Sequence, residues 1–419
     1  MADRPSPEVQ QAQTPPGSRS ASGTVGTVGR NGSRLSLALL GYVLGVVVLI
    51  NLAPFDFTWP IAGGVPLKES PFDVLGNLLI FVPAGFLFRL TRGRGGWPAA
   101  LDVLVLALAA STLIEAVQAL EPYRTSSVLE AVAEGAGAWF GALLFDELSR
   151  RLNLIPGTMG RLVLEPPLMG LVYLLVPLLW LSSLGAGSGF DRPLITILLG
   201  LCGGSLLADV YRYQLGPAGV LSSAGLAGTA ASWYLVGAVP GSALHPWQTL
   251  AGAAAVAGFA WLRCRRPVVV GERRFEIAAL RRVIPLFTGY LVLIALWPMP
   301  SSPIGAWHGA TGTGFPELSD ITLEVTRLIE FCAAVTVAGY ILAELRGREE
   351  LPFSATAPRL LLAVGVLVGV LELVRGFHPE HSASLLRWAL AVAAAGLGGL
   401  IYNLQRAHVR NLARSRASS

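Results

Sequence analysis

Residues 35–53 read LSLALLGYVLGVVVLINLA and contain no charged side chain. As a helix rising 1.5 Å per residue, this run is long enough to cross the hydrocarbon core of a bilayer, which is about 30 Å thick. Apolar runs at 168–185, 283–298 and 360–374 approach the same length. The sequence therefore predicts a membrane protein with several spanning helices.

The composition of the whole chain agrees with this class. Hydrophobic residues make up 53% of the 419 residues and charged residues only 14%, with a mean hydropathy of +0.59. Soluble domains carry about 25% charged residues. The net charge of +5 is dispersed between apolar runs, which argues against a nucleic-acid partner, and the 3 cysteines form no CxxC pair, so neither a disulfide framework nor a zinc site is expected.

We expect an all-α polytopic bundle of about twelve helices. They are placed at 35–53, 72–90, 99–118, 127–146, 166–185, 193–209, 217–239, 246–262, 282–298, 321–343, 358–376 and 384–403. Residues 1–33 are predicted to be a disordered cytoplasmic tail and 406–419 a basic cytoplasmic tail. Between them we expect three four-helix units: an N-terminal unit (34–150), a central unit (151–265) and a C-terminal unit (266–405).

The basic residues predict how the bundle is oriented. If the N-terminus is cytoplasmic and the count of helices is even, most of the 31 Lys and Arg residues fall in cytoplasmic segments. This asymmetry is the positive-inside pattern of membrane proteins. We therefore expect a multi-pass membrane protein with both termini in the cytoplasm.

Two segments of the chain resemble each other. Residues 115–141 and 372–398 align without a gap, and the aligned pairs include Glu115 with Glu372 and Ser127 with Ser384. The two segments begin eight helices apart and so share one orientation, which predicts a parallel internal repeat of a four-helix unit. The central unit has the same number of helices, but no residue pattern identifies it as a third copy.

The N-terminal unit carries polar residues near one side of the membrane. Ionisable groups cost at least about 2.5 kcal/mol inside a bilayer and usually face a cavity or a partner. Spacings of three and four place them on shared helix faces. The candidate ligand-binding residues are Asp73, Asn77, Glu115, Gln118, Arg124, Ser127, Glu130 and Glu134. Helix capping would explain Asp73 and Ser127, but not the three glutamates.

The C-terminal unit carries a second polar set of mixed charge: Arg327, Glu330, Glu372, Arg375, His381 and Arg387. We expect the two sets to face each other around one polar pocket open to the outside, because opposite charges offset part of the desolvation cost. His378 and His381 belong to an HPEH run, but Pro379 disturbs the helical spacing of ligands. No metal site and no cofactor are predicted.

The N-terminal residues also resemble a known family. Asp73 and Asn77 precede a Phe81-x-Pro83-x-Gly85 turn, a Glu115-x-x-Gln118 helix follows, and then come Arg124, Ser127, Glu130, Glu134 and Gly137. This order is similar to that of VanZ-like proteins over about residues 35–147. Glu130 and Glu134 stand where the family usually has Asp and Asn. The resemblance implies a cell-envelope protein of the bacterial inner membrane and a link to low-level teicoplanin resistance.

Our leading hypothesis is a non-enzymatic membrane protein that binds an envelope lipid or glycolipid through Arg124, Gln118 and Asn77. The first alternative is a proton-coupled secondary transporter, in which the glutamates would carry the protons. A lipid-modifying enzyme would use paired acids, but no nucleophile or metal motif accompanies them. A purely structural role, in which charged groups lock helices together, is the fourth possibility.

Overall fold

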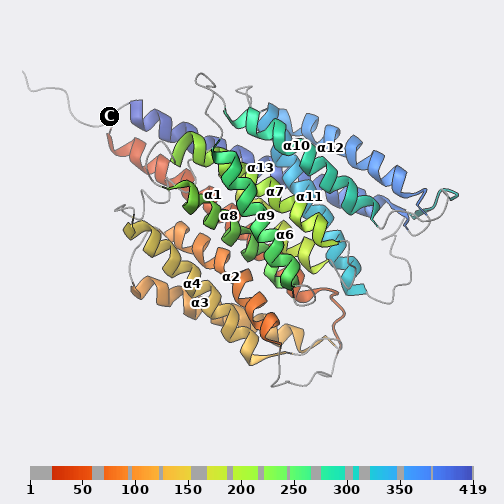
Figure 1. Ribbon diagram of the computed structural model, residues 1–419, viewed down its shortest axis with the longest axis horizontal. Coiled ribbons are helices and arrows are strands. Elements are labelled where there is room, and N and C mark those ends of the chain that lie inside the picture. The colour runs from red at the N-terminus through yellow and green to blue at the C-terminus, as the bar shows by residue number, and fades with distance from the viewer. Residues whose placement is uncertain are drawn as a thin grey trace, which may run out of the picture.

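The described residues form twelve α-helices, which lie side by side in a bundle (Figure 1). The computed structural model describes residues 21–58, 70–92, 97–121, 126–151, 168–185, 192–215, 221–242, 246–265, 275–297, 305–310, 321–346, 353–378 and 381–417. The helices are α1 (Ala21–Leu52), α2 (Pro71–Arg92), α3 (Trp97–Gln118), α4 (Val128–Arg151), α6 (Met169–Leu184), α7 (Arg192–Val210), α8 (Ser223–Ala238), α9 (Pro246–Cys264), α10 (Phe275–Leu296), α11 (Ile321–Arg346), α12 (Phe353–Arg375) and α13 (Leu385–Ala417).

Three shorter features complete the described chain. A π-helical turn, η1 (Tyr211–Leu215), extends α7, and a 3-10 turn, η2 (Val239–Gly241), follows α8. The strands β1 (Gly309–Ala310) and β2 (Ala383–Ser384) pair in parallel, with Gly309 opposite Ala383. This short ladder joins the segment after α10 to the start of α13.

The twelve predicted helices correspond one to one with the twelve that the described residues form, and the all-α class is confirmed. Nine of the described helices are long and apolar enough to cross a membrane. A helix satisfies its backbone hydrogen bonds internally, as the hydrocarbon requires. The chain is a multi-pass membrane protein with the lipid bilayer as its surroundings.

Near both ends of the chain, helices extend into the segments that were expected to be tails. Helix α1 begins at Ala21, inside the segment expected to be disordered, and α13 continues to Ala417, through most of the expected basic tail. The extension of α13 has partners: Gln405 Oε1 accepts from the backbone N–H of Gly170 at 3.0 Å and from the hydroxyl of Tyr340 at 2.5 Å. Residues 1–20 and 418–419 lie outside the described residues.

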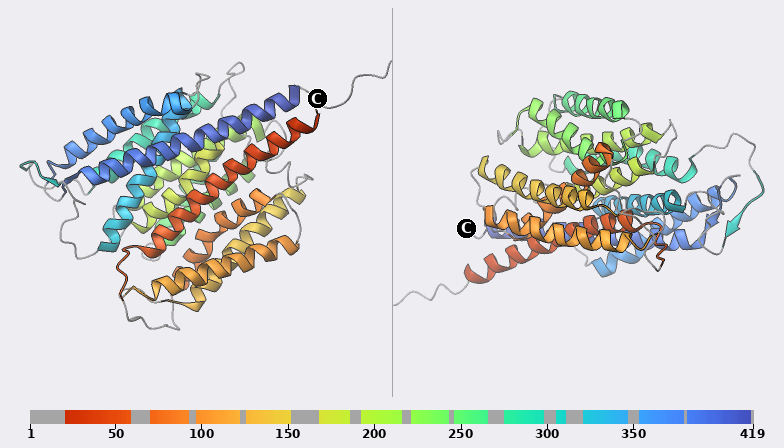
Figure 2. Two further views of the ribbon diagram at one scale, coloured as in Figure 1. Left: turned by 180° about the vertical axis from the view of Figure 1, so that it is seen from behind. Right: turned by 90° about the horizontal axis from the view of Figure 1, so that it is seen from below.

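Helix α1 lies between two groups of helices. On one side it packs against α2, and on the other against α13 (Figure 2). The group α2–α3–α4 is therefore separated from α11–α12–α13 by α1, while α6 to α9 cover another face of the bundle. This placement decides which polar residues can meet.

Helices α2 and α4 approach closely, and so do α11 and α13. A Cβ atom on Gly141 would lie 2.0 Å from the carbonyl oxygen of Val82, and one on Gly398 would lie 1.9 Å from that of Thr336. Only glycine allows backbones this close. Edge-to-face aromatic pairs accompany both contacts, Phe86 with Phe145 and Tyr340 with Tyr402.

Candidate functional site

In the N-terminal unit, Glu115 holds the start of α4. Its Oε2 accepts the backbone N–H of Ser127 at 2.7 Å, and its main-chain carbonyl accepts the Ser126 hydroxyl at 2.8 Å. The Ser127 hydroxyl accepts the N–H groups of Leu129 and Glu130, at 3.1 and 3.4 Å. Ser127 is therefore the N-cap of α4, which is the capping role weighed as the alternative to ligand binding.

Two other residues of this set are buried. Gln118 donates from Nε2 to the main-chain oxygen of Asn51 at 2.7 Å, which ties the end of α3 to the end of α1. Glu134 is only 1% exposed and lies within electrostatic range of both Glu115 and Glu130. The three glutamates predicted to share a site are therefore neighbours.

The remaining residues of the first set are more peripheral. Asp73 is exposed in the first turn of α2, where Ser70 rather than Asp73 precedes the helix and accepts the N–H of Phe72 at 3.2 Å. Asn77 is half-buried one turn later. Arg124 lies outside the described residues. The cap role expected of Asp73 therefore belongs to Ser70.

In the C-terminal unit, Glu372 makes the bond that corresponds to that of Glu115. Its Oε2 accepts the backbone N–H of Ser384 at 2.9 Å. Arg387 adds two charge-assisted bonds, from Nε to Oε1 at 2.6 Å and from Nη2 to Oε2 at 2.5 Å. Both side chains of this ion pair are 8% exposed. Paired donors of this kind fix a carboxylate firmly.

The other residues of the second set gather near this ion pair. Arg375 lies within electrostatic range of Glu372, Arg387 and Arg327. Arg327 also pairs with Glu324 at 3.3 Å. Deeper in the bundle, Glu330 is 1% exposed and accepts the hydroxyl of Tyr290 at 3.0 Å.

His381 lies in the connection between α12 and α13, beside His378. The two imidazole rings have centroids 4.2 Å apart, and Nε2 of His381 lies 3.2 Å from the main-chain oxygen of Trp297. Burial, together with the nearby Arg375 guanidinium, lowers the pKa of His381 to about 3. His381 is therefore neutral at physiological pH.

The two polar sets do not form the shared pocket that the sequence suggested. Helix α1 lies between α2–α3–α4 and α11–α12–α13, so the glutamates of the first set and the arginines of the second lie in different parts of the bundle (Figures 1 and 2). The prediction that the two sets pair with each other rested on their opposite charges alone. Residues of each set instead interact with residues of their own helices.

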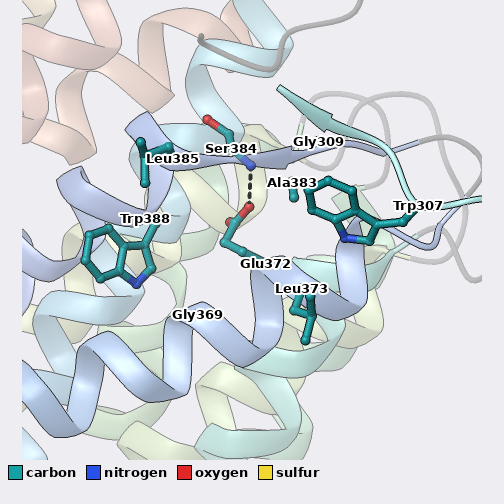
Figure 3. Close-up of a pocket in the computed structure, with 9 residues that line it drawn as sticks. All are labelled: Trp307, Gly309, Gly369, Glu372, Leu373, Ala383, Ser384, Leu385 and Trp388. Carbon is teal, nitrogen blue, oxygen red and sulfur yellow. Dashed lines mark hydrogen bonds between the residues drawn. The ribbon is translucent and has the colours of Figure 1, made fainter. Parts of the chain in front are cut away.

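A pocket opens beside the Glu372–Arg387 ion pair, with a volume of about 520 Å³ (Figure 3). Its lining residues are Trp307, Gly309, Gly369, Glu372, Leu373, Ala383, Ser384, Leu385 and Trp388. Trp307 and Trp388 lie on either side of Glu372 in the figure. Leu373 and Leu385 are 55% and 62% exposed, so the rim of the pocket is apolar and open.

Backbone contacts fix the position of Trp307. The N–H of His308 donates to the carbonyl of Gly376 at 2.7 Å, and the N–H of Ala383 donates to the carbonyl of His308 at 3.0 Å. The indole lies so close to Gly376 that a Cβ atom there would be 2.1 Å from its Nε1. On the other side, Trp388 donates from Nε1 to the carbonyl of Gly365 at 2.8 Å.

Sequence reasoning missed both tryptophans of this pocket. Trp388 lies near the start of the helix predicted at 384–403, where Trp is enriched at membrane interfaces, and that position was the available signal. Trp307 lies between the helices predicted at 282–298 and 321–343, so its position gave no such signal. The ladder between β1 and β2, which brings Trp307 to α12, leaves only two residues per strand and has no recognisable pattern.

A third charged cluster surrounds Asp209, which is fully buried at the end of α7. Its carboxylate lies 3.0 Å from Arg263, 3.3 Å from Arg282 and 3.6 Å from Arg212. These arginines come from α9, α10 and η1, so one acid ties three segments together. In the sequence, the adjoining arginines indicate only which side of the membrane is cytoplasmic. Nothing in their pattern predicts that they bind Asp209.

Comparison with known proteins identifies the N-terminal part of the chain. The sequence model of the family described as VanZ/LLP1 matches residues 22–155. No curated protein and no solved structure matches the chain. The matched segment covers α1 to α4 and contains Glu115, Gln118, Ser127, Glu130 and Glu134, the residues that carried the resemblance. Residues 22–155 of this membrane protein are therefore similar to the VanZ/LLP1 family.

Proposed function

We propose that this protein is a non-enzymatic membrane protein of the bacterial inner membrane that binds an envelope lipid or glycolipid. The observation that carries the proposal is the pocket of Figure 3, where two tryptophans flank a buried ion pair under an apolar rim. Its volume lies within the range of about 300–1,000 Å³ that is typical of ligand sites.

The chemistry of the pocket suits an amphipathic ligand. Leu373 and Leu385 offer apolar surface that is open at the rim, where an acyl or prenyl chain would lie. The indole rings of Trp307 and Trp388 offer flat surfaces with a polar edge, as in aromatic belts of membrane interfaces. Ser384 and Glu372 are the polar residues of the lining and are 2% and 6% exposed, so a polar head group would lie beside them.

A parallel duplication belongs to the same proposal. Matched contacts in the two units support it: Glu115 and Glu372 bind the N–H groups of Ser127 and Ser384, at 2.7 and 2.9 Å. The glycine contacts and the aromatic pairs described above add to this support. The C-terminal unit would then be a diverged VanZ-like copy, in which an arginine has replaced the glutamate at the position of Glu130.

The orientation is also part of the proposal. The positive-inside pattern supports an orientation in which the pocket of Trp307 and Trp388 lies at the external face of the membrane and both termini lie in the cytoplasm. Labelling of a single introduced cysteine in the described loop at His308 by a membrane-impermeant reagent in intact cells tests this. Labelling only after the membrane is permeabilised would reverse the orientation.

Binding of a lipid-linked wall precursor to the purified full chain in nanodiscs tests the function. We expect Trp307→Ala to weaken binding roughly thirtyfold, the loss typical of a central aromatic contact worth about 2 kcal/mol. Trp247, which is 63% exposed at the start of α9, provides a matched control. Equal affinity of wild type and Trp307→Ala would refute the pocket as the site.

A second variant reaches the same site without removing an aromatic ring. Gly376→Ala places a methyl group where the Trp307 indole lies, and so displaces the indole. We expect this variant to bind the precursor as weakly as Trp307→Ala, with a similar melting temperature. The same lipid without its sugar head group separates recognition of the head from recognition of the chain.

The family's link to glycopeptides leads to a cellular test. If the protein holds a wall precursor, its expression in a sensitive host should raise the minimal inhibitory concentration of teicoplanin, and Trp307→Ala should abolish that increase at equal expression. An equal increase of the minimal inhibitory concentration with the Trp307→Ala variant would show that resistance does not depend on this pocket. Proton-coupled transport, the alternative reading of the glutamates, stays a prediction.

A further inference from the structure

One glycine of the tryptophan pocket is not explained by helix packing. At Gly141 and Gly398, a Cβ atom would lie 2.0 and 1.9 Å from a backbone oxygen of the neighbouring helix, so the close approach requires glycine. At Gly369 of α12, no described atom outside its own helical turn lies nearer than 3.5 Å to the Cβ position, which is an ordinary contact distance. Glycine is less favourable than alanine inside a helix. Its presence at position 369 therefore needs another reason.

The absence of a side chain at Gly369 leaves a notch in the wall of the pocket. Gly369 is half-buried and lines the cavity of about 520 Å³, beneath Trp388 in Figure 3. A methyl carbon at its Cβ position would lie 3.5 Å from Nε1 and 4.0 Å from Cδ1 of the Trp388 indole. These separations are close to the optimum for dispersion attraction. The notch is therefore a site that one methyl group would fill.

A second notch of the same kind lies one helical turn away, at Gly365. A methyl carbon at its Cβ position would lie 3.6 Å from Cζ2 of Trp388 and 3.7 Å from Cγ2 of Val392. Gly365 is also half-buried, and its carbonyl oxygen accepts the indole N–H of Trp388 at 2.8 Å. The spacing of four residues places both notches on one face of α12, roughly 6 Å apart along its axis. The indole of Trp388 thus borders two methyl-sized notches in a row.

The surface beside the notches is apolar and open. Val366, Val370 and Leu373 are 60%, 53% and 55% exposed, and residues 360–371 contain no polar side chain. A hydrocarbon chain that leaves the pocket can therefore lie along α12 beside Trp388, toward the centre of the membrane.

This inference rests on the proposed function and narrows the class of its ligand. We propose that the ligand carries a methyl-branched isoprenoid chain, and that two of its methyl branches fill the notches at Gly369 and Gly365. A straight acyl chain has no branches, so it leaves both notches empty and loses their dispersion contacts. The polar head group lies beside Glu372 and Ser384, as described above.

Competition binding to the purified full chain in nanodiscs tests the chain preference. The probes share one phosphate head group: a polyprenyl phosphate, its fully saturated counterpart, and a straight-chain alkyl phosphate of equal chain length. We expect both branched lipids to bind more tightly than the straight one, by roughly fourfold for each notch filled, the ratio that corresponds to about 0.8 kcal/mol per buried methyl group. Equal binding of the branched and straight lipids would overturn the proposal.

Alanine variants place the protein's own methyl group in each notch. We expect Gly369→Ala and Gly365→Ala each to weaken binding of the branched lipids roughly fourfold and to leave binding of the straight lipid unchanged. Neither variant should lower the melting temperature, because each Cβ atom fits and alanine favours a helix. Gly45→Ala, in α1 with no described atom within 4 Å of the Cβ position, is the matched control and should keep the wild-type preference.

The outcomes separate this inference from the function on which it rests. A preference for branched lipids that survives in Gly369→Ala/Gly365→Ala would overturn the assignment of the notches, even if the wild type binds the lipid-linked precursor. If the wild type binds neither the precursor nor any of the three phosphates, the proposed function itself fails.

Discussion

Arg387 forms a two-bond ion pair with Glu372, and the positions that match these residues in the N-terminal unit are occupied by Glu130 and Glu115. In both units the first glutamate binds the N–H of a serine at the start of the following helix. The C-terminal unit thus carries a cation where the VanZ-like unit carries a third acid beside Glu134 and Glu115.

Removing Arg387 should strongly destabilise the bundle. Arg387→Leu leaves Glu372 buried without its cation, and breaking a buried ion pair costs about 3–5 kcal/mol. Thermal unfolding in detergent measures the change. Arg150→Leu removes one partner of an exposed pair with Glu147, so it should cost no more than about 1 kcal/mol.

The double variant Glu372→Leu/Arg387→Leu distinguishes pairing from packing. Because it removes both charges together, we expect it to recover most of the stability that Arg387→Leu loses. If the double variant were as unstable as Arg387→Leu, the loss would come from packing rather than from an unpaired carboxylate.

Removing the charge of Asp209 should destabilise the bundle about as much as removing Arg387. Asp209→Asn leaves Arg212, Arg263 and Arg282 facing one another without a counter-charge, and we expect a loss of about 3–5 kcal/mol. The melting temperature of the purified protein reports this. Asp102→Asn changes an exposed residue of α3 and should leave the melting temperature nearly unchanged.

Gly141 and Gly398 should respond alike to the same substitution. Gly141→Ala and Gly398→Ala each place a Cβ atom 2.0 and 1.9 Å, respectively, from a backbone oxygen, which is far inside van der Waals contact, so the helices must separate. Overpacking of this kind costs about 1–3 kcal/mol. Gly45→Ala, where nothing lies within 4 Å, is the control.

This comparison also tests the proposed duplication. Similar losses of melting temperature for Gly141→Ala and Gly398→Ala, well above that for Gly45→Ala, are expected from two copies of one helix packing. A loss confined to one of the two glycines would contradict equivalent packing in the two units.

His381 should make the folded state sensitive to acid. Its pKa is lowered to about 3 by burial, and by Arg375, His378 and Arg327. Because an unfolded histidine titrates near 6.5, the unfolded state binds more protons between about pH 6.5 and 3. Stability from neutral His381 is therefore complete above about pH 6.5 and declines as the pH falls through this window.

Melting temperatures measured from pH 7 to pH 4 check this sign. His381→Gln should flatten the decline, because glutamine stays neutral, whereas His308→Gln, a change of an exposed histidine, should follow the wild type. A wild-type melting temperature that rises on acidification would reverse the assigned direction.

The helices could be predicted from the sequence because the membrane demands long apolar runs, and each of these runs became a helix. The contact of Glu115 with the start of α4 was also within reach, since a short connection brings the ends of α3 and α4 together. The spatial relation between the two polar sets could not be predicted. Residue spacing identifies side chains that share a helix face, but it does not say which neighbouring helix packs against that face. Helix α1 lies between the two polar sets, where their opposite charges had suggested a shared pocket.

The position of Trp307 shows a second limit. Its indole is placed by backbone bonds from His308 to Gly376 and from Ala383 to His308. Backbone hydrogen bonds between segments that are distant in sequence do not depend on a pattern of side chains. The pocket could therefore not be predicted from the sequence.

The contact between α1 and α13 has a consequence for how the protein is made. Helix α1 is synthesised long before α13, yet the two pack along each other, and α13 is further tied to α6 by Gln405. The flank of α1 that α13 covers must therefore wait for its partner until α13 has been made. A ribosome that stalls before α13 would leave this flank of α1 uncovered, and such chains should be preferred substrates of membrane quality-control proteases.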